Sequence, residues 1–280
     1  MNWLRNQLTA LLTACALTCT ALVSPVGAMP VGGNLLQNSY IPPNNSVFVP
    51  CTIIAGYTAW YNPSTLQHTG SVVTSWSDAS ANGYNITTAH ASPVYSASGG
   101  PNGLPSMQLN GTTQYLSSSV VIMSNLVSTT AYTIYAVFQI TSYTGANNTN
   151  FSQTGGVFQS ATSLEVGMGT GSSDLLAGHK PSGSQVTQVG PATSTGITVI
   201  VEMYYDGTNI NLRVNGTGYG PTAAGSVNAL GDDLQIGADV PLTHFFKGYI
   251  SELIFYNTTL SSGNRTTMRT CLGSKYNGTG

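Results

Sequence analysis

The sequence has very few charged residues. Only 6% of its 280 residues are Asp, Glu, Lys or Arg, whereas charged residues make up about a quarter of an average soluble domain. The formal net charge is -2, and the seven Lys and Arg residues are scattered along the chain. Because nucleic-acid-binding domains gather basic residues on one face, this composition argues against a nucleic-acid partner. Neutral polar and aromatic side chains are better suited to uncharged ligands such as glycans.

Catalytic motifs are also scarce. No Gly-x-Ser-x-Gly elbow lies between a predicted strand and a helix, and the four histidines lack metal-ligand spacing. Glu165, Glu202 and Glu252 each lie alone on a separate predicted strand. A retaining glycosidase needs two carboxyl groups about 5–5.5 Å apart, and no single strand supplies such a pair. We therefore expect a protein without catalysis; a polysaccharide hydrolase is the less favoured alternative, because folding can bring distant carboxylates together.

Acidic residues cluster at only one place in the sequence. Asp232, Asp233 and Asp239 lie close enough together to suggest a calcium site, since Ca²⁺ prefers several oxygen ligands. The surrounding residues do not resemble a defined calcium-binding loop, and the alternative is a solvated turn without metal. Calcium is thus the only cofactor that the sequence suggests.

Residues 1–28 have the pattern of a secretory signal peptide. Arg5 gives a positive start, residues 8–23 are largely apolar, and Val26-Gly27-Ala28 is a small-residue cleavage site. We expect cleavage after Ala28 and a secreted or cell-surface protein. Lipidation at Cys15 is one alternative. Retention as a membrane anchor is another, although the apolar run is shorter than a bilayer requires.

The next segment, residues 29–50, is rich in Pro, Gly and Asn. This composition predicts an extended arm or linker, which could also join subunits in an assembly. The folded domain then covers residues 51–280.

The stretch 245–278 is the most informative part of that domain. Its first half is apolar on both faces, which is typical of a strand at the centre of a packed sheet. The alternation assigns Tyr249, Leu253 and Phe255 to one face and Ile250, Ile254 and Tyr256 to the other.

Glu252 is the exception in this apolar strand. It falls on the face of Ile250 and Ile254, so we expect it to be buried. A buried carboxylate needs hydrogen-bond donors or a cation, and the sequence offers hydroxyl or backbone groups, Arg213 or Lys247. We interpret Glu252 as a structural acid.

A short helix should follow this strand. Four residues at helical spacing form an apolar side, Ser261 or Ser262 can cap the start, and Gly278 can end it. The apolar side consists of Met268, Cys271, Leu272 and Tyr276.

Other segments also have strand patterns. The clearest is the hairpin 197–216, in which Asp206-Gly207 forms the turn and Ile197, Val199 and Val201 begin one apolar face. Further strands are expected at 52–61, 132–141, 156–169, 175–180 and 234–237.

Four stretches resemble the laminin-G-like and concanavalin A-like jelly-roll domains. The run 246–257, followed by a helix with a late Lys-Tyr-Asn-Gly, resembles the end of such a domain. Trp76, Asp78, Ser80 and Asn82-Gly83 resemble a second motif, although Ala81 stands where the family more often has Gly. The other two are Asn102-Gly103-Leu104-Pro105 and the pair Tyr205-Asp206-Gly207 with Val214-Asn215-Gly216.

This resemblance implies an all-β fold of two antiparallel sheets with a C-terminal helix. It also implies recognition of a glycan or glycosylated surface, that is, a carbohydrate-binding or adhesive module. A structural or receptor-binding protein of a virion or cell-surface assembly is the alternative. The ligand-binding candidates are Trp60, Tyr61, Trp76, Asn147, Asn148 and Asn150.

Two of these features have local explanations. Trp76 is better explained as a core residue, and Asp78 as a brace for the Asn82-Gly83 turn. The resemblance also brings the two ends of the domain together, so Cys51 and Cys271 become candidates for a disulfide in an exported protein. Two separate buried thiols are the alternative.

Overall fold

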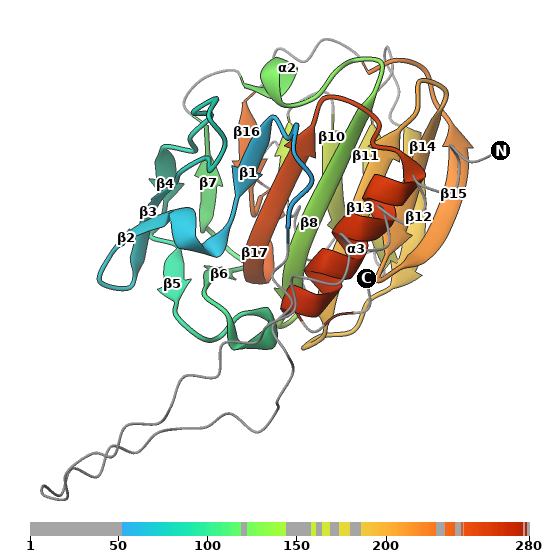
Figure 1. Ribbon diagram of the computed structural model, residues 1–280. Helices are drawn as coiled ribbons and strands as arrows, with labels where there is room; N and C mark the ends of the chain where they lie inside the picture. Colours follow the sequence, from blue (N-terminus) through green and yellow to red (C-terminus); the bar gives the residue numbers. More distant parts are fainter. Residues whose placement is uncertain are drawn as a thin grey trace, which may run out of the picture. The chain divides into compact units, whose positions relative to one another are not determined.

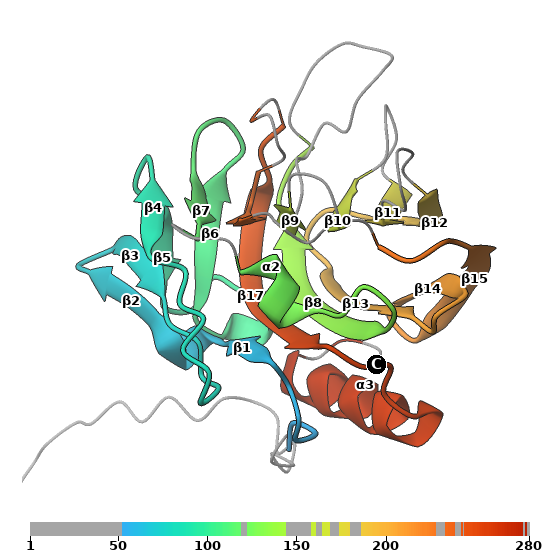
Figure 2. The same ribbon diagram turned by 90° about the horizontal axis from the view of Figure 1, so that it is seen from above.

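The computed structural model describes residues 52–118, 122–143, 158–160, 164–168, 174–179, 186–227, 233–238, 242, 244–276 and 278. In these residues two antiparallel sheets pack face to face, and a helix covers the outer side of the larger sheet (Figure 1, Figure 2). The predicted all-β sandwich with a C-terminal helix is confirmed. The signal peptide and the arm lie outside the described residues, so both remain predictions.

The larger sheet has ten strands. Its order is β15 (Thr217–Ala223), β14 (Asn209–Val214), β13 (Thr198–Tyr205), β8 (Tyr132–Ile140), β17 (Lys247–Tyr256), β6 (Ser106–Asn110), β5 (Val94–Ser96), β3 (Val72–Trp76) and β2 (Leu66–Thr69), with β1 (Ala59–Tyr61) also paired to β17.

The smaller sheet has seven strands. Its order is β12 (Val186–Ala192), β11 (Asp174–His179), β10 (Leu164–Met168), β9 (Phe158–Ser160), β16 (Leu234–Ile236), β7 (Tyr115–Ser117) and β4 (Thr88–His90). The helical elements are η1 (Pro63–Thr65), η2 (Pro101–Gly103), α2 (Met123–Leu126) and α3 (Ser262–Tyr276).

Strand β17 is central, as its two apolar faces predicted. Strand β8 pairs along one edge, while β6 and β1 share the other edge. Gly248 is the first residue of β17 that pairs with β8, and its φ is 154°. A Cβ there would lie 2.1 Å from the backbone oxygen of Gln139, so only glycine allows the two strands to approach this closely.

A β-bulge in β17 corrects the predicted assignment of its faces. The register with β8 shifts between Ile250 and Glu252, which leaves Ser251 as the extra residue. Ile250 therefore lies in the core between the sheets, as Leu253 does, rather than on the face of Ile254. Ser251 is buried, and its hydroxyl lies 2.7 Å from that of Ser106.

Helix α3 packs on the outer face of the ten-stranded sheet (Figure 2). The predicted apolar side is correct: Met268, Cys271, Leu272 and Tyr276 are buried. Ser261 accepts a hydrogen bond from the backbone N–H of Asn264 at 3.2 Å, which is the geometry of a helix cap. Met268, Leu272 and Tyr276 pack against the outward side chains of the sheet, namely Tyr135, Val137, Ile200, Ile254 and Tyr256.

Cys271 is disulfide-bonded. Cys51, its predicted partner, lies outside the described residues, so the pairing itself remains a prediction.

Several strand boundaries differ from the predictions. The first strand covers only Ala59–Tyr61, because residues 52–58 are irregular in backbone. The hairpin of β13 and β14 is confirmed, and Asp206 braces its turn by accepting from the N–H groups of Thr208 and Asn209. Ile197 precedes β13 and is 43% exposed, so it does not belong to the apolar face.

None of the helices in the described residues is both long and apolar enough to cross a membrane.

Candidate functional site

Two of the predicted ligand-binding residues are in the core. Tyr61 and Trp76 are fully buried, so a glycan cannot reach them and their assignment as ligand-binding residues is wrong. The Tyr61 hydroxyl donates to the backbone oxygen of Tyr84, and the Trp76 indole donates to that of Asn62. Burial and, to a smaller extent, Asp78 raise the pKa of Tyr61 well above its usual value, so its phenol stays protonated.

Asp78 is a turn brace, as its local explanation predicted. Its carboxylate accepts from the backbone N–H groups of Trp60, Ser80 and Tyr84 at 2.8–3.0 Å. It also accepts from the Ser80 hydroxyl. The motif that resembles the family therefore fixes β1 beside the turn and has no spare oxygen pointing to a ligand.

The remaining sequence candidates lie mostly elsewhere. Asn147, Asn148 and Asn150 lie outside the described residues, as do Asp232 and Asp239, so the loop and the calcium site remain untested. Asp233 is partly exposed. Among the described residues, no group of three or more His, Cys, Asp or Glu could hold a metal ion.

Glu252 is buried beneath α3, as predicted. Its side chain is fully buried and is bound by three donors: the Trp60 indole at 2.5 Å, Lys275 Nζ at 2.7 Å and the Tyr276 hydroxyl at 2.6 Å. Burial, followed by the charge of Glu252, raises the pKa of Tyr276 well above its usual value, so the phenol remains a donor.

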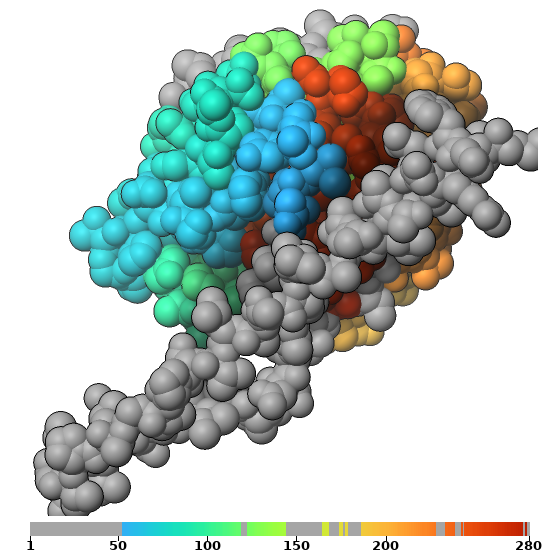
Figure 3. Space-filling view, in the orientation of Figure 1, coloured from blue at the N-terminus to red at the C-terminus, as the bar shows by residue number. Residues whose placement is uncertain are grey.

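The partners of Glu252 differ from those predicted. Neither Arg213 nor Lys247 contacts it; the cation is Lys275, near the end of α3. Trp60 is therefore a structural partner of a buried acid. Its side chain remains partly exposed, so its role in ligand binding stays a prediction. Figure 3 shows the segment around β1, in blue, lying against the red C-terminal segment.

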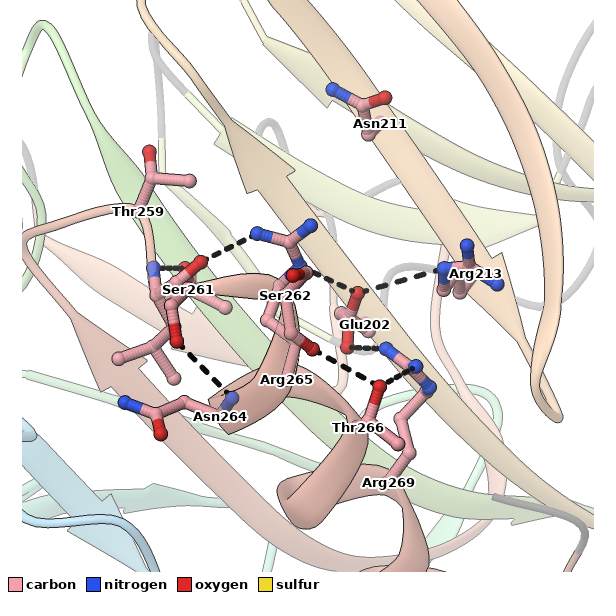
Figure 4. Close-up of polar contacts among 12 residues, drawn as sticks. Glu202, Asn211, Arg213, Thr259, Ser261, Ser262, Asn264, Arg265, Thr266 and Arg269 are labelled. Carbon is pink, nitrogen blue, oxygen red and sulfur yellow. Dashed lines mark hydrogen bonds and ion pairs between the residues drawn. The ribbon is translucent and has the colours of Figure 1, made fainter.

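A second buried acid, Glu202 on β13, has a larger set of cationic partners (Figure 4). Its carboxylate lies 2.6 Å from Arg269 Nη1, 3.3 Å from Arg265 Nε and 3.9 Å from Arg213 Nε. The Arg265 contact has the distance of an ion pair but not the angle of a hydrogen bond, so Glu202 Oε1 and Arg265 Nε have no hydrogen-bond partner. Arg265 also lies 3.8 Å from the centre of the Tyr204 ring.

These contacts correct the inference that the basic residues are scattered. Arg213, Arg265, Arg269 and Lys275 converge on two carboxylates beneath α3. They are four of the seven Lys and Arg residues of the whole chain. Most of the positively charged residues in this sequence thus form ion pairs with two buried glutamates.

Glu202 and Glu252 do not form an open catalytic pair. Glu202 is opposite Tyr135, which is opposite Ile254, so one strand separates the two acids. With strands about 4.8 Å apart and a rise of about 3.3 Å per residue, their backbones are roughly 12 Å apart. Both side chains are 0% exposed, and no substrate can reach either carboxylate while α3 is packed on the sheet.

The outer face of the seven-stranded sheet has a different character. One register row crosses all seven strands and contains polar residues and one glycine, with Glu165 as its only charge. The alternate positions on β4, β7, β10 and β16 point into the core between the sheets. The row consists of Thr88, Ser117, Gln235, Gln159, Glu165, Gly178 and Thr187.

An aromatic pair lies at one end of this row. His90 and Tyr115 stack with ring centres 4.0 Å apart and an angle of 7° between the rings. His90 Nε2 lies 2.9 Å from the Ser117 hydroxyl, and Phe245 packs beside Tyr115. All three aromatic residues are partly exposed. Flat rings beside neutral hydrogen-bonding groups can contact both the C–H face and the hydroxyl groups of a sugar ring.

The residues of this face were not found from the sequence. His90 and Tyr115 are far apart in the chain and meet only because β4 pairs with β7. The alternation in Tyr115-Leu116-Ser117, with Leu116 buried between two outward residues, was the available signal.

The comparisons with known proteins agree with this architecture. The Laminin_G_3 family model, described as the Concanavalin A-like lectin/glucanases superfamily, matches residues 110–264, more than half of the chain. The chain belongs to this superfamily. No curated protein matches it significantly.

Solved structures share the concanavalin A-like fold at low sequence identity. The binding domain of botulinum neurotoxin serotype G has a TM-score of 0.55 at 9% identity, covering 77% of this chain and 50% of that chain. Domain 4 of AbnA, an extracellular GH43 arabinanase from Geobacillus stearothermophilus solved with arabinotriose, has a TM-score of 0.50 at 16% identity, covering 76% and 96%.

Trypanosoma rangeli sialidase also shares the fold, with a TM-score of 0.51 at 13% identity. The match covers 81% of this chain and 34% of the sialidase. The chain therefore spans about a third of the sialidase and half of the neurotoxin binding domain. At these identities the likeness concerns the fold alone.

The aromatic pair makes a prediction about pH. Desolvation lowers the pKa of His90 from its usual value near 6.5, so the folded protein favours the neutral ring. The contribution of His90 to stability is then complete above pH 6.5 and is lost as the pH falls through its lowered pKa. A histidine ring titration by NMR should give His90 a pKa below that of the unfolded chain; an equal or higher value would contradict the prediction.

Proposed function

We propose that this protein binds carbohydrate on the outer face of its seven-stranded sheet. The observation that carries the proposal is the His90–Tyr115 stack beside a register row with a single charge. Sugars are neutral and rich in hydroxyl groups, so they are recognised by uncharged donors and acceptors together with aromatic rings. The shared fold with an arabinanase domain solved with arabinotriose supports the same reading.

We further propose that the protein does not cleave its ligand. Two of its glutamates, Glu202 and Glu252, are buried and held by arginine, lysine, tryptophan and tyrosine. In the described part of the sheet face the register row contains one carboxylate, Glu165. Glycoside hydrolysis requires two carboxyl groups in most families, and this row supplies only one.

Receptor binding at a cell surface is the second candidate function. It is favoured by the fold shared with the neurotoxin binding domain, and it is compatible with export after Ala28. A glycosylated receptor would use the same sheet face, so the two candidates differ in the size of the ligand and not in its chemistry.

The proposal is tested by replacing Tyr115. A glycan array identifies a ligand of the wild-type protein, and titration calorimetry then compares its affinity for the variants. Tyr115→Ala should weaken binding roughly tenfold, because it removes the ring that stacks on His90.

A matched control is available on the other sheet. His68 and Tyr95 stack with centres 3.8 Å apart and the same 7° angle, so Tyr95→Ala removes an equivalent ring elsewhere. We expect Tyr95→Ala to bind as the wild type does. If wild type binds no glycan, or if Tyr115→Ala binds as tightly as wild type, the proposed site is wrong.

A further inference from the structure

The cluster around Glu202 contains more positive charge than it can neutralise. Three guanidinium groups meet one carboxylate, which leaves a surplus of two positive charges among the described residues (Figure 4). The Glu202 side chain is fully buried, while Arg265 and Arg269 are 14% and 13% exposed and Arg213 is 39% exposed. The surplus therefore lies at a surface that solutes can reach.

The three arginines also have more hydrogen-bond donors than the cluster has acceptors. Each guanidinium has five N–H donors and no acceptor. Apart from Glu202, the acceptors are the backbone oxygens of Leu260 and Gly216 and the hydroxyl of Thr266. Arg265 Nε and Glu202 Oε1 lie 3.3 Å apart and are both buried without a hydrogen-bond partner, so they add one unused donor and one unused acceptor. Donors thus outnumber acceptors in a partly desolvated place, where an unused donor costs free energy.

The position of the cluster on α3 adds to this imbalance. Arg265 lies near the N-terminus of a helix of 15 residues whose first turn contains no acidic residue. The dipole of a helix disfavours cations near its N-terminus. Packing and dipole therefore both leave a positive potential here.

The exposed edge of the cluster is accessible from β15. Gly218 is paired with Arg213, and a Cβ at Gly218 would lie 3.4 Å from the guanidinium carbon. With glycine at this position, the planar face and the outer N–H groups of Arg213 stay uncovered by a side chain from that strand.

We propose that Arg213, Arg265 and Arg269 form a binding site for an oxyanion, namely a carboxylate, sulfate or phosphate group. The fork of an arginine matches two oxygens of such a group, and one bound anion would offset a large part of the surplus charge. This site is separate from the proposed glycan face, because it lies on the outer side of the other sheet. It also does not depend on that proposed function.

The first experiment uses inorganic sulfate as the probe and the full chain. The arginine Nε–H signals are followed by NMR during a sulfate titration, with chloride held at the same ionic strength. Signals of Arg213, Arg265 and Arg269 should shift in a saturable way. Arg213→Gln should weaken sulfate binding roughly tenfold, and Arg213→Lys should weaken it less, because the charge is kept and the fork is lost.

Lys247→Gln is the matched control. It removes one positive charge from a different place, the start of β17, and should leave sulfate binding unchanged. Equal losses in Lys247→Gln and Arg213→Gln would show a general charge effect and would overturn the site. Arginine signals that do not move with sulfate would overturn it as well.

A second experiment identifies the source of the anion. Neutral oligosaccharides are compared with the same oligosaccharides that carry a uronate or sulfate group. Tighter binding of the acidic set, lost in Arg213→Gln and kept in Tyr115→Ala, would assign an acidic glycan to the cluster. Sulfate binding without this preference would assign a free oxyanion. Binding of neutral glycans with no sulfate response would overturn the oxyanion site and leave the proposed function intact.

Discussion

Replacing Glu202 with glutamine should lower the free energy of unfolding by about 3–5 kcal/mol, the usual effect of removing one partner of a buried ion pair. Glutamine has nearly the same shape, so the loss comes from the charge. Arg265 and Arg269, both less than a fifth exposed, would then repel each other and Arg213 without a counter-charge. Thermal denaturation followed by circular dichroism should show a melting temperature roughly 10 °C lower.

Two variants separate charge from packing in this prediction. Adding Arg269→Gln to Glu202→Gln removes one of the repelling charges, so the double variant should recover part of the lost stability. Glu165→Gln, on the other sheet and partly exposed, should change the melting temperature by no more than about 2 °C, as surface substitutions usually do. A Glu202→Gln protein as stable as wild type would show that the ion pairs contribute nothing.

The second large effect is expected for Glu252→Gln. A glutamine amide has one acceptor oxygen, which can accept two hydrogen bonds, whereas Trp60, Lys275 and Tyr276 all donate to the present carboxylate. We expect a loss of about 2–3 kcal/mol. It should be smaller than for Glu202, because Lys275 is 20% exposed and can turn toward water.

The same variant distinguishes a structural acid from a catalytic acid. Reducing-sugar release from polysaccharides should be absent in wild type and variant, while glycan binding should be equal in both. Sugar release by wild type that disappears in Glu252→Gln at an unchanged melting temperature would make Glu252 a catalytic residue. That result would also contradict the proposal of a protein without catalysis.

Strong periodicity made the centre of the fold predictable. Strands β8, β13, β14 and β17 have long apolar faces, and α3 has four apolar residues at helical spacing, so each was found near its actual bounds. Strand β15 was missed because Thr217–Ala223 contains Gly and Pro, which usually indicate a loop. Such residues are tolerated here because β15 is the edge of its sheet.

The faces of β17 could not be predicted in full. A pattern of alternation assumes that every residue pairs, whereas Ser251 is an extra residue opposite β8. The burial of Glu252 was predictable from the apolar residues around it in the strand, and it is confirmed. Its partners could not be predicted, because Lys275 and Tyr276 reach Glu252 only through the packing of α3 on the sheet.

The partners of Glu202 could also be predicted only in part from the sequence. Arg213 is adjacent to Glu202 through the register of β13 and β14, which a hairpin prediction can supply. Arg265 and Arg269 lie on helix α3, which follows β17 in the sequence. These two arginines reach Glu202 only because α3 packs on the sheet. The positions of basic residues in the sequence do not indicate this contact.

Because α3 follows the strands of the sheet in the sequence, it is synthesised after them and can pack on the sheet only late in folding. A ribosome makes Glu202 and Glu252 before Arg265, Arg269 and Lys275. Until α3 emerges, the sheet therefore carries two acids without their cations on a face lined by Tyr135, Ile254 and other apolar residues. A nascent or shortened chain that lacks α3 would expose this apolar surface to other protein chains. Release of the chain before α3 is complete should therefore favour aggregation.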